Sequence, residues 1–186
     1  VENIRNQFVG FHKEIDKLMT KVENILADAS EKGIDLAFDF NQNEHIIGSY
    51  QDVINKRKEF AYLGELVREL DKEYNEKLQA KAFENIDELI AQAVDNKLVV
   101  VLNDVDKNSL KPLADRLMDK LPNGFLFIAN VSDNKVTFIA KSNVDIHAGK
   151  IAKEAAIITG GNGGGRPDMA QAGGPNGMEA DKALEA

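Results

Sequence analysis

The residues best suited to chemistry lie in one short stretch, where seven of the fifteen residues from 160 to 174 are glycine. Ordering glycine costs more conformational entropy than ordering any other residue, so a packed core has no use for such a run. Bare glycine amides can approach a ligand closely, and the guanidinium group of Arg166 is a planar fork of donors that suits a phosphate. Arg166-Pro167-Asp168 predicts the start of a short helix, whose exposed amides would attract an anion. The stretch therefore predicts an anion-binding, glycine-rich loop at residues 160–165.

A flexible linker and a nucleotide-binding P-loop are the alternatives for a glycine run. Linkers are usually rich in serine and continue as low-complexity sequence. This run instead leads into the specific segment Arg-Pro-Asp-Met-Ala-Gln-Ala. A P-loop needs Gly-Lys followed by Ser or Thr directly after a strand, whereas the segment before Gly160 has a helical pattern. Composition alone leaves the linker open, and the segment after the run favours the anion loop.

Two strings of this region carry a resemblance to a known family. Residues 163–174 read Gly-Gly-Gly-Arg-Pro-Asp-Met-Ala-Gln-Ala-Gly-Gly, and residues 145–150 read Asp-Ile-His-Ala-Gly-Lys. Together they closely resemble the C-terminal domain of alanyl-tRNA synthetase, over residues 96–186. Asn162 departs from the family by interrupting the glycine run, although Asn tolerates the left-handed region better than most residues. The resemblance implies a region that holds the outer corner of tRNA(Ala) and supports aminoacylation and editing by other domains.

The resemblance also implies where nucleic acid is bound: in the glycine run, just after it, and on the preceding helix. The expected residues are Gly161, Gly163, Gly164, Gly165, Arg166, Gln171, Lys150 and His147. From the sequence alone, a single histidine or lysine on a helix is more often an ordinary surface residue than a ligand contact. No catalytic residue, metal ligand or cofactor is expected in this chain. ATP, magnesium and zinc are expected only in the missing domains of the parent ligase.

A related module occurs in free-standing alanyl-tRNA editing proteins and in DHH-type phosphoesterases, and both are kept as alternatives. A phosphoesterase needs an Asp-rich metal site in a preceding domain, and no segment of this chain supplies one. Sequence upstream of Val1 would separate an editing protein from the synthetase. The missing initiator methionine predicts a fragment of a longer protein. A helical scaffold without any ligand is disfavoured by the Gly-Arg-Pro-Asp-Met-Ala-Gln string.

The composition predicts a globular chain of the reducing cytoplasm. The 186 residues are 43% hydrophobic and 29% charged, and they include no cysteine for a disulfide or a thiolate site. No apolar run approaches the length of about 18 residues that would span a membrane, so no membrane partner is expected. The net charge of −8 lies entirely in residues 1–95, which have 12 basic and 20 acidic residues, against 11 and 11 afterwards. Nucleic-acid binding is therefore expected in the second part of the chain.

Two long helices are predicted in the first part. Apolar residues recur at spacings of three and four over residues 4–29 and again over residues 50–82, which is the pattern of a helical seam. Between them, Leu36, Phe38 and Phe40 alternate with other residues and predict a short strand or, as we favour, an extended connector packed on the helices. The helices could fold as an antiparallel hairpin within one chain or pair between chains as a coiled coil. The resemblance implies a homodimer formed through this segment.

The expected fold class is a mixture of α+β and α/β. A helical, dimerising subdomain is expected over residues 1–84, and a globular α/β subdomain with a mixed sheet and the glycine loop over residues 85–186. Apolar runs predict a strand buried on both faces at 98–102, and further strands at 125–129 and 136–140. A helix between the first two strands predicts parallel pairing.

Two short signals complete the expected second subdomain. The dipeptide Asp133-Asn134 predicts a tight turn, so that the third strand returns antiparallel to the second. Asp145 is expected to cap a helix that runs to about Thr159, directly before the glycine loop.

Overall fold

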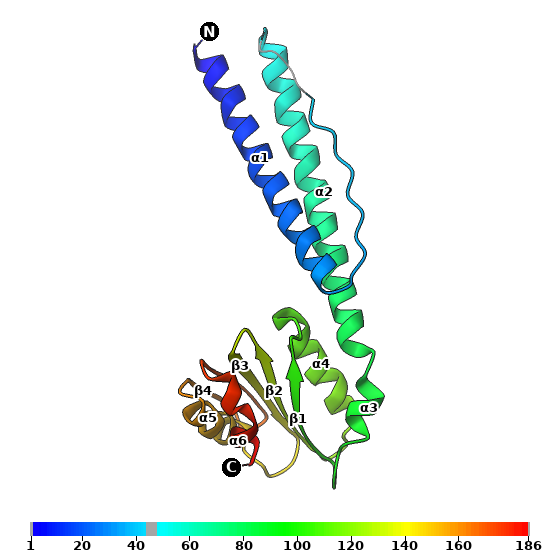
Figure 1. Ribbon diagram of the computed structural model, residues 1–186, viewed down its shortest axis with the longest axis vertical. Coiled ribbons are helices and arrows are strands. Elements are labelled where there is room, and N and C mark those ends of the chain that lie inside the picture. Colours follow the sequence, from blue (N-terminus) through cyan, green and yellow to red (C-terminus); the bar gives the residue numbers. More distant parts are fainter. Residues whose placement is uncertain (1, 44–47, 186) are drawn as a thin grey trace. The chain divides into compact units, whose positions relative to one another are not determined.

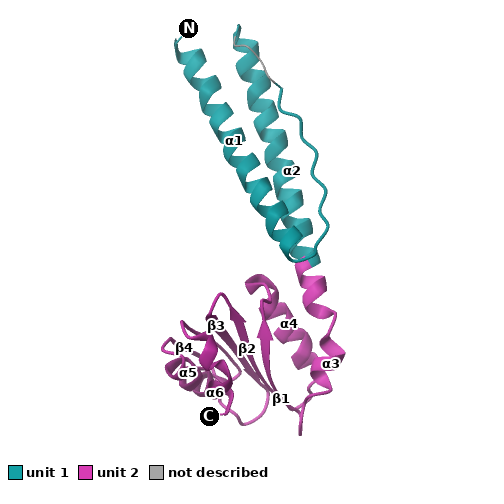
Figure 2. Ribbon diagram, in the orientation of Figure 1, with its two compact units in different colours: residues 1–77 teal, residues 78–186 magenta. Residues whose placement is uncertain are grey.

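The computed structural model of the chain describes residues 2–43 and 48–185. The chain divides into two compact units, residues 1–77 and residues 78–186 (Figure 2). Helix α2 (Tyr50–Phe83) contributes residues to both units. Among the described residues, no helix is long and apolar enough to cross a membrane.

The first unit consists of α1 (Glu2–Glu31), an extended connector and α2 up to residue 77, with the two helices side by side (Figure 1). The helices are parallel, because the contacts between them advance along both helices in the same direction. The rings of Phe11 and Phe60 lie 6.0 Å apart, and Lys21 Nζ lies 3.4 Å from a carboxylate oxygen of Asp71. The antiparallel hairpin, one of the two arrangements predicted for these helices, is therefore wrong. The two apolar seams pack on each other in parallel within one chain.

The extended connector makes the parallel arrangement possible. The Asp35 carbonyl accepts a hydrogen bond from Lys77 (2.6 Å), and the Asn43 amide donates to Glu59 (2.8 Å). From residue 35 to residue 43, an extended chain covers about 27 Å at about 3.4 Å per residue. From residue 77 back to residue 59, helix α2 covers about the same length at about 1.5 Å per residue. The connector thus returns the chain along α2, and its apolar side chains are half-buried as expected: Leu36, Phe38 and Phe40.

The second unit is built on a five-stranded mixed sheet in the order β1-β2-β3-β5-β4 (Figure 1). The pair β1–β2 is parallel and the other pairs are antiparallel. The strands are β1 (Lys97–Asn103), β2 (Phe125–Ser132), β3 (Lys135–Ser142), β4 (Asn162–Gly165) and β5 (Met169–Gly174). The helices are α3 (Ile86–Ile90), α4 (Lys107–Asp119), α5 (Ala148–Ile158) and α6 (Ala180–Glu185), with a 3-10 turn η1 at Gly177–Glu179. The predicted order of long helices followed by a mixed sheet is thus confirmed.

The predicted parallel pair and tight hairpin are both present. Helix α4 connects β1 to β2, and Val99 lies opposite Phe127 in the parallel register. Asp133 and Asn134 have φ of 49° and 59°, the left-handed backbone of a two-residue hairpin turn that Asp and Asn tolerate. The expectation that the first strand is buried on both faces is wrong, because β1 lies at the edge of the sheet and Val99 is 47% exposed. An apolar run does not reveal a strand's place in the sheet order.

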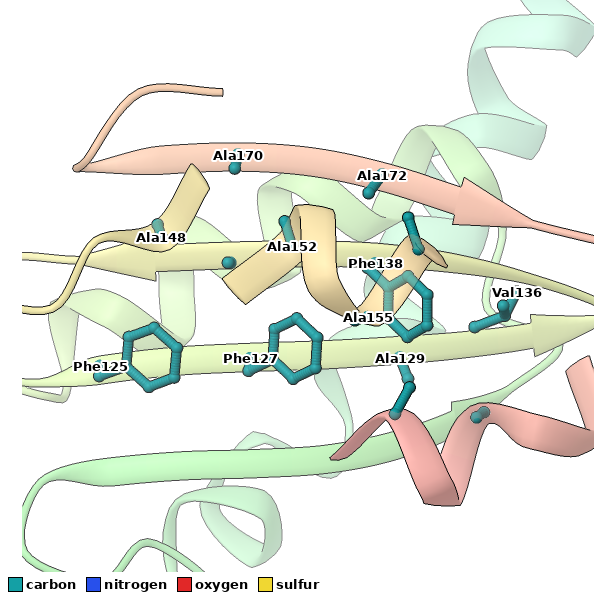
Figure 3. Packing of buried hydrophobic residues seen from close by; sticks show 14 residues of the cluster. Phe125, Phe127, Ala129, Val136, Phe138, Ala148, Ala152, Ala155, Ala170 and Ala172 are labelled. Carbon is teal, nitrogen blue, oxygen red and sulfur yellow. The ribbon is translucent and has the colours of Figure 1, made fainter. Parts of the chain in front are cut away.

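Helices cover both faces of the sheet. On one face, α3 and α4 pack on residues of β1, β2 and β3 that include Leu98, Leu126 and Ile139. On the other face, alanines of α5 and β5 surround Phe127 and Phe138, whose rings stack with centroids 5.5 Å apart (Figure 3). Because alanine side chains are small, α5 can lie close to the main chain of β5 and β4. This packing positions the glycine run.

The glycine run forms strand β4 and not the expected loop. Residues 162–165 pair with β5, and Gly164 lies opposite Gln171. The expected short helix after Arg166 is also wrong, because residues 166–168 form a tight turn that leads into β5. Glycine has a low intrinsic preference for strands, so the sequence pattern could not reveal this one. Pairing with β5 and packing on α5 hold these residues extended.

Candidate nucleic-acid interface

Most glycines around the β4–β5 hairpin have a packing role. A side chain at Gly161, Gly163 or Gly165 would overlap the main chain of β5. A side chain at Gly149, in the first turn of α5, would overlap the main chain of Gly165. The helix and the edge strand therefore touch through their backbones, which only glycine allows. No ligand is needed to explain these four glycines.

Gly164 is the exception, because a Cβ atom there would meet no atom of the described residues within 4 Å, apart from its two chain neighbours. Its φ is 152°, a value that residues with side chains rarely adopt. It pairs with the exposed Gln171, whose neighbours Ala170 and Ala172 point toward α5 (Figure 3). Because side chains alternate along a strand, Gln171 and Gly164 lie on the opposite face of the sheet. At the sheet edge, this face thus offers bare main chain beside one amide side chain.

The turn at residues 166–168 is fastened to the start of α5 by its main chain. The carbonyl of Arg166 accepts a hydrogen bond from the Gly149 amide (3.1 Å), and the carbonyl of Pro167 accepts one from the Ala148 amide (2.9 Å). These two amides belong to the first turn of α5, where amides have no partner within the helix. Since the turn occupies them, they are not available to a ligand. The expected attraction of an anion to free amides at a helix start therefore has no support at this position.

The side chains of Arg166 and Asp168 meet on the surface of this turn. Arg166 Nε lies 3.2 Å from Asp168 Oδ1, and Nη2 donates to Oδ2 over 3.4 Å. Both side chains are largely exposed, at 75% and 64%. Asp168 is absent from the residues predicted for the site. The signal that could have found it is the Arg-Pro-Asp spacing, which suits a tight turn with its two charged ends on one side.

His147 and Lys150 lie beside this turn, because α5 begins there. His147 precedes the first helical residue, and its Nδ1 accepts a hydrogen bond from the Lys150 amide (3.3 Å). His147 is therefore the cap, and the expectation that Asp145 would cap this helix is wrong. The helix begins at Ala148, later than expected, where its first amides reach the carbonyls of the turn. Both His147 and Lys150 are exposed.

The eight predicted residues thus fall into three groups. At the turn lie His147, Lys150, Gly165 and Arg166; on the open sheet face lie Gly164 and Gln171; and at packing positions just before and within β4 lie Gly161 and Gly163. In the described part of the chain, no group of three or more His, Asp or Glu side chains could hold a metal ion. The arrangement offers exposed cationic groups at one end of the hairpin and a bare, polar strand edge next to them.

Comparison with known proteins gives matches to a domain family and to curated enzymes. Residues 95–186 match the family described as the DHHA1 domain. The alanine–tRNA ligase of Natranaerobius thermophilus is 44% identical over 144 residues, which cover 72% of this chain and 16% of that protein. The chain thus spans less than a fifth of the length of this relative.

Solved structures also show similarity. The C-Ala domain of the alanyl-tRNA synthetase from Aquifex aeolicus is 28% identical with a TM-score of 0.44, covering 48% of this chain and 84% of that one. RecJ from Thermus thermophilus, in complex with Mg2+, is 18% identical with a TM-score of 0.46, covering 72% of this chain and 21% of that one.

Proposed function

We propose that this chain, whose resemblance to alanyl-tRNA synthetase is confirmed by its alanine–tRNA ligase relatives, is the C-terminal region of such an enzyme and binds tRNA(Ala). In this proposal residues 95–186 hold the outer corner of the tRNA. Aminoacylation and editing take place in other parts of the parent ligase, which also hold its ATP and metal ions. The match of residues 95–186 to the DHHA1 domain supports this division of the chain.

The observation that carries the proposal is the open main chain at Gly164. At the neighbouring glycines packing excludes a side chain, whereas at Gly164 the described residues leave open space and only the φ of 152° disfavours a side chain. Open space beside a bare backbone allows a ligand to come close to it. The adjacent Gln171 amide offers both a donor and an acceptor, which suits a ribose 2′-hydroxyl or a base edge. Close approach of RNA at this edge is therefore the role that we assign to Gly164.

The turn beside this edge supplies charge for the phosphates. Arg166 and Lys150 are exposed cations there, and His147 is an exposed polar group. From residue 96 onward the chain has 11 basic and 11 acidic residues, so counterion release contributes little to affinity. Useful affinity then has to come from the shape of the RNA and from close contacts. This requirement favours a folded tRNA over single-stranded RNA.

Replacing Gly164 with valine tests the proposal. We expect tRNA(Ala) to bind more weakly by about 1 to 2 kcal/mol, because the side chain blocks close approach, with an unchanged salt dependence because no charge is lost. Gly64→Val is the control for an added side chain alone, since among the described residues a side chain at Gly64 also meets nothing within 4 Å. Gly64 lies in α2 of the first unit and lacks the positive φ of Gly164. Fluorescence anisotropy at several salt concentrations measures binding, and thermal melting monitors folding.

Three outcomes would contradict parts of this proposal. Unchanged binding in Gly164→Val would show that the open edge is not used. A loss of binding together with a collapsed melting temperature would make Gly164 a structural residue. Equal affinity of the unchanged chain for tRNA(Ala) and for an unstructured oligonucleotide of equal length would contradict the tRNA role. It would favour the substrate module of a phosphoesterase instead.

We also propose that the chain self-associates through its first unit. The connector and the helices cover much of each apolar seam, yet Val9 and Tyr62 remain 41% and 58% exposed. The ring pair of Phe11 and Phe60 is only half-buried. Two helices and one extended segment enclose a thin core, and small units of this kind gain stability by burying more apolar surface. A second copy of the chain would supply that cover.

A further inference from the structure

Hydrogen bonds to neighbouring segments hold the main chain of the turn at residues 166–168 in place. The Arg166 amide donates to the Met169 carbonyl (2.9 Å), which closes the hairpin, and the Asp168 carbonyl accepts from the Ser142 amide (2.9 Å). The two remaining carbonyls of the turn accept from the start of α5, as described above. The backbone therefore cannot carry Arg166 away from Asp168. Only rotation of the two side chains can separate them.

We propose that Asp168 is an intramolecular competitor for the Arg166 guanidinium group, which any phosphate ligand has to displace. The carboxylate lies 3.2 and 3.4 Å from two guanidinium nitrogens, which is the face that a phosphate would use. The tRNA part of this inference rests on the proposed function. The competition itself applies to any polyanion.

The charge of Asp168 lowers the attraction of the turn for a polyanion. A paired arginine and aspartate carry no net charge, so the turn exerts little long-range attraction on a polyanion. When a phosphate takes the guanidinium group, the carboxylate becomes free and recruits a cation from solution. The cation taken up offsets a cation released from the RNA, so the contact adds little to the salt dependence of binding. Arg166 then contributes mainly once an RNA is already docked at Gly164 and Gln171.

Asp168→Asn tests the competition, because it removes the charge and keeps the shape of the side chain. At low salt we expect the dissociation constant for an oligouridine to fall about three- to fivefold, and the slope of log affinity against log salt to steepen by about one unit. Asp145→Asn is the matched control, since Asp145 is an exposed carboxylate in the loop just before α5. We expect its effect to stay below about twofold, because exposed charges at a distance are screened.

The decisive measurement is a double-mutant cycle with Arg166→Ala. If Asp168 acts through Arg166, Asp168→Asn in the Arg166→Ala background should change oligouridine binding no more than Asp145→Asn does. The same gain with and without Arg166 would overturn the inference, and so would equal effects of Asp168→Asn and Asp145→Asn in the unchanged background. The proposed function fails separately, when the unchanged chain shows no preference for tRNA(Ala) over oligouridine.

Discussion

At the scale of single residues, glycine has two distinct roles in one run. Gly163 and Gly165 are glycine because strand β5 lies against them, and Gly149 is glycine because β4 lies against it. Gly164 has no such neighbour. The composition does not distinguish these positions, whereas the space around each glycine shows whether packing excludes a side chain there. The binding hypothesis is therefore narrower than the sequence suggested, and it centres on Gly164, Gln171 and the adjacent turn.

Arg166→Ala tests the charge at this turn. We expect tRNA binding to weaken by about 1 to 3 kcal/mol, because a charge-assisted phosphate contact is lost. The salt dependence should change little, since the cation that the freed Asp168 takes up already offsets the one released at the Arg166 contact. Folding should be unaffected because the side chain is 75% exposed. Unchanged tRNA affinity in this variant, with an intact melting transition, would exclude Arg166 from the interface.

Asp28, Lys32 and Tyr74 form a titratable cluster that joins α1 to α2. The Tyr74 hydroxyl donates to Asp28, and Lys32 Nζ donates to Asp28 over 3.0 Å and to the Tyr74 oxygen over 3.2 Å. The hydrogen bonds from Tyr74 and then Lys32 hold the pKa of Asp28 below its ordinary 3.8. Burial and then the bond to Asp28 raise the pKa of Tyr74 above 10.0. Burial opposes the charge of Lys32, yet its two hydrogen bonds raise its pKa above 10.5.

These shifts predict how the stability of the first unit depends on pH. The lowered pKa of Asp28 stabilises the fold above about pH 4, and this contribution is lost as the pH falls through the folded pKa. The raised pKa values of Tyr74 and Lys32 stabilise the fold below about pH 10, and that contribution is lost as the pH rises through them. Tyr74→Phe should flatten both arms of a plot of urea midpoint against pH. Tyr62→Phe, at an exposed tyrosine, is the control, and identical profiles for both variants would contradict a role for the cluster.

At the scale of elements, a buried ion pair fixes the end of the connector. Lys56 and Glu59 on α2 are 2.9 Å apart, with side chains only 1% and 8% exposed. Lys56 donates to the Asn43 carbonyl over 3.2 Å, and Glu59 accepts from the Asn43 amide over 2.8 Å. The pair thus satisfies both main-chain groups of one connector residue. The Lys56 ammonium group also lies 5.7 Å from the centre of the Phe8 ring, which adds α1 to the contact.

Lys56→Met should destabilise the first unit strongly, because it leaves a buried carboxylate without its partner. We expect a loss of about 3 to 5 kcal/mol from the free energy of unfolding. Lys56→Met combined with Glu59→Leu should cost less than Lys56→Met alone, because no unpaired charge remains. Lys72→Met is the control, since its partner Glu76 lies 3.8 Å away and both side chains are mostly exposed; it should cost less than about 1 kcal/mol. Urea unfolding followed by circular dichroism measures the stability of all three variants. Similar losses for Lys56→Met and Lys72→Met would contradict the stabilising role of the buried ion pair.

Sequence patterns predicted the apolar elements well and the glycine element poorly. The runs that begin at Leu98, Phe125 and Val136 read as strands because apolar, β-branched and aromatic residues prefer that state. Strand β4 has no such residues, so its conformation depends entirely on β5 and α5. The turn after it was mistaken for a helix start because Arg-Pro-Asp suits both structures. Pairing with β5 and packing on α5 decide between a turn and a helix start.

At the scale of the whole molecule, the direction of the two long helices was also beyond the sequence. A heptad seam has the same spacing whether its partner runs parallel or antiparallel, so the pattern over residues 4–29 could not choose. The connector determines the direction, because its extended residues 35–43 run back along α2 from residue 77 to residue 59. The alternation of Leu36, Phe38 and Phe40 was the available signal, since a segment with one apolar face needs a surface beneath it.

The parallel arrangement changes the prediction of self-association. Because the seams already meet within one chain, a dimer has to use the apolar groups that this packing leaves exposed, and Val9 and Tyr62 are such groups. Sedimentation velocity on the full chain should detect dimers at concentrations on the order of tens of micromolar. Val9→Lys combined with Tyr62→Lys should weaken association by more than about tenfold, because the new charges would be buried without partners.

Asn75→Lys adds a positive charge at another exposed position of α2 and serves as the control for charge alone. If both lysine variants weaken association equally, the effect does not depend on where the charge is placed and the proposed surface is wrong. If the unchanged chain stays monomeric over this concentration range, the two helices and the connector are sufficient to cover the apolar seams. The exposed Tyr62 would then be an ordinary surface residue, because a single apolar side chain at a surface needs no partner.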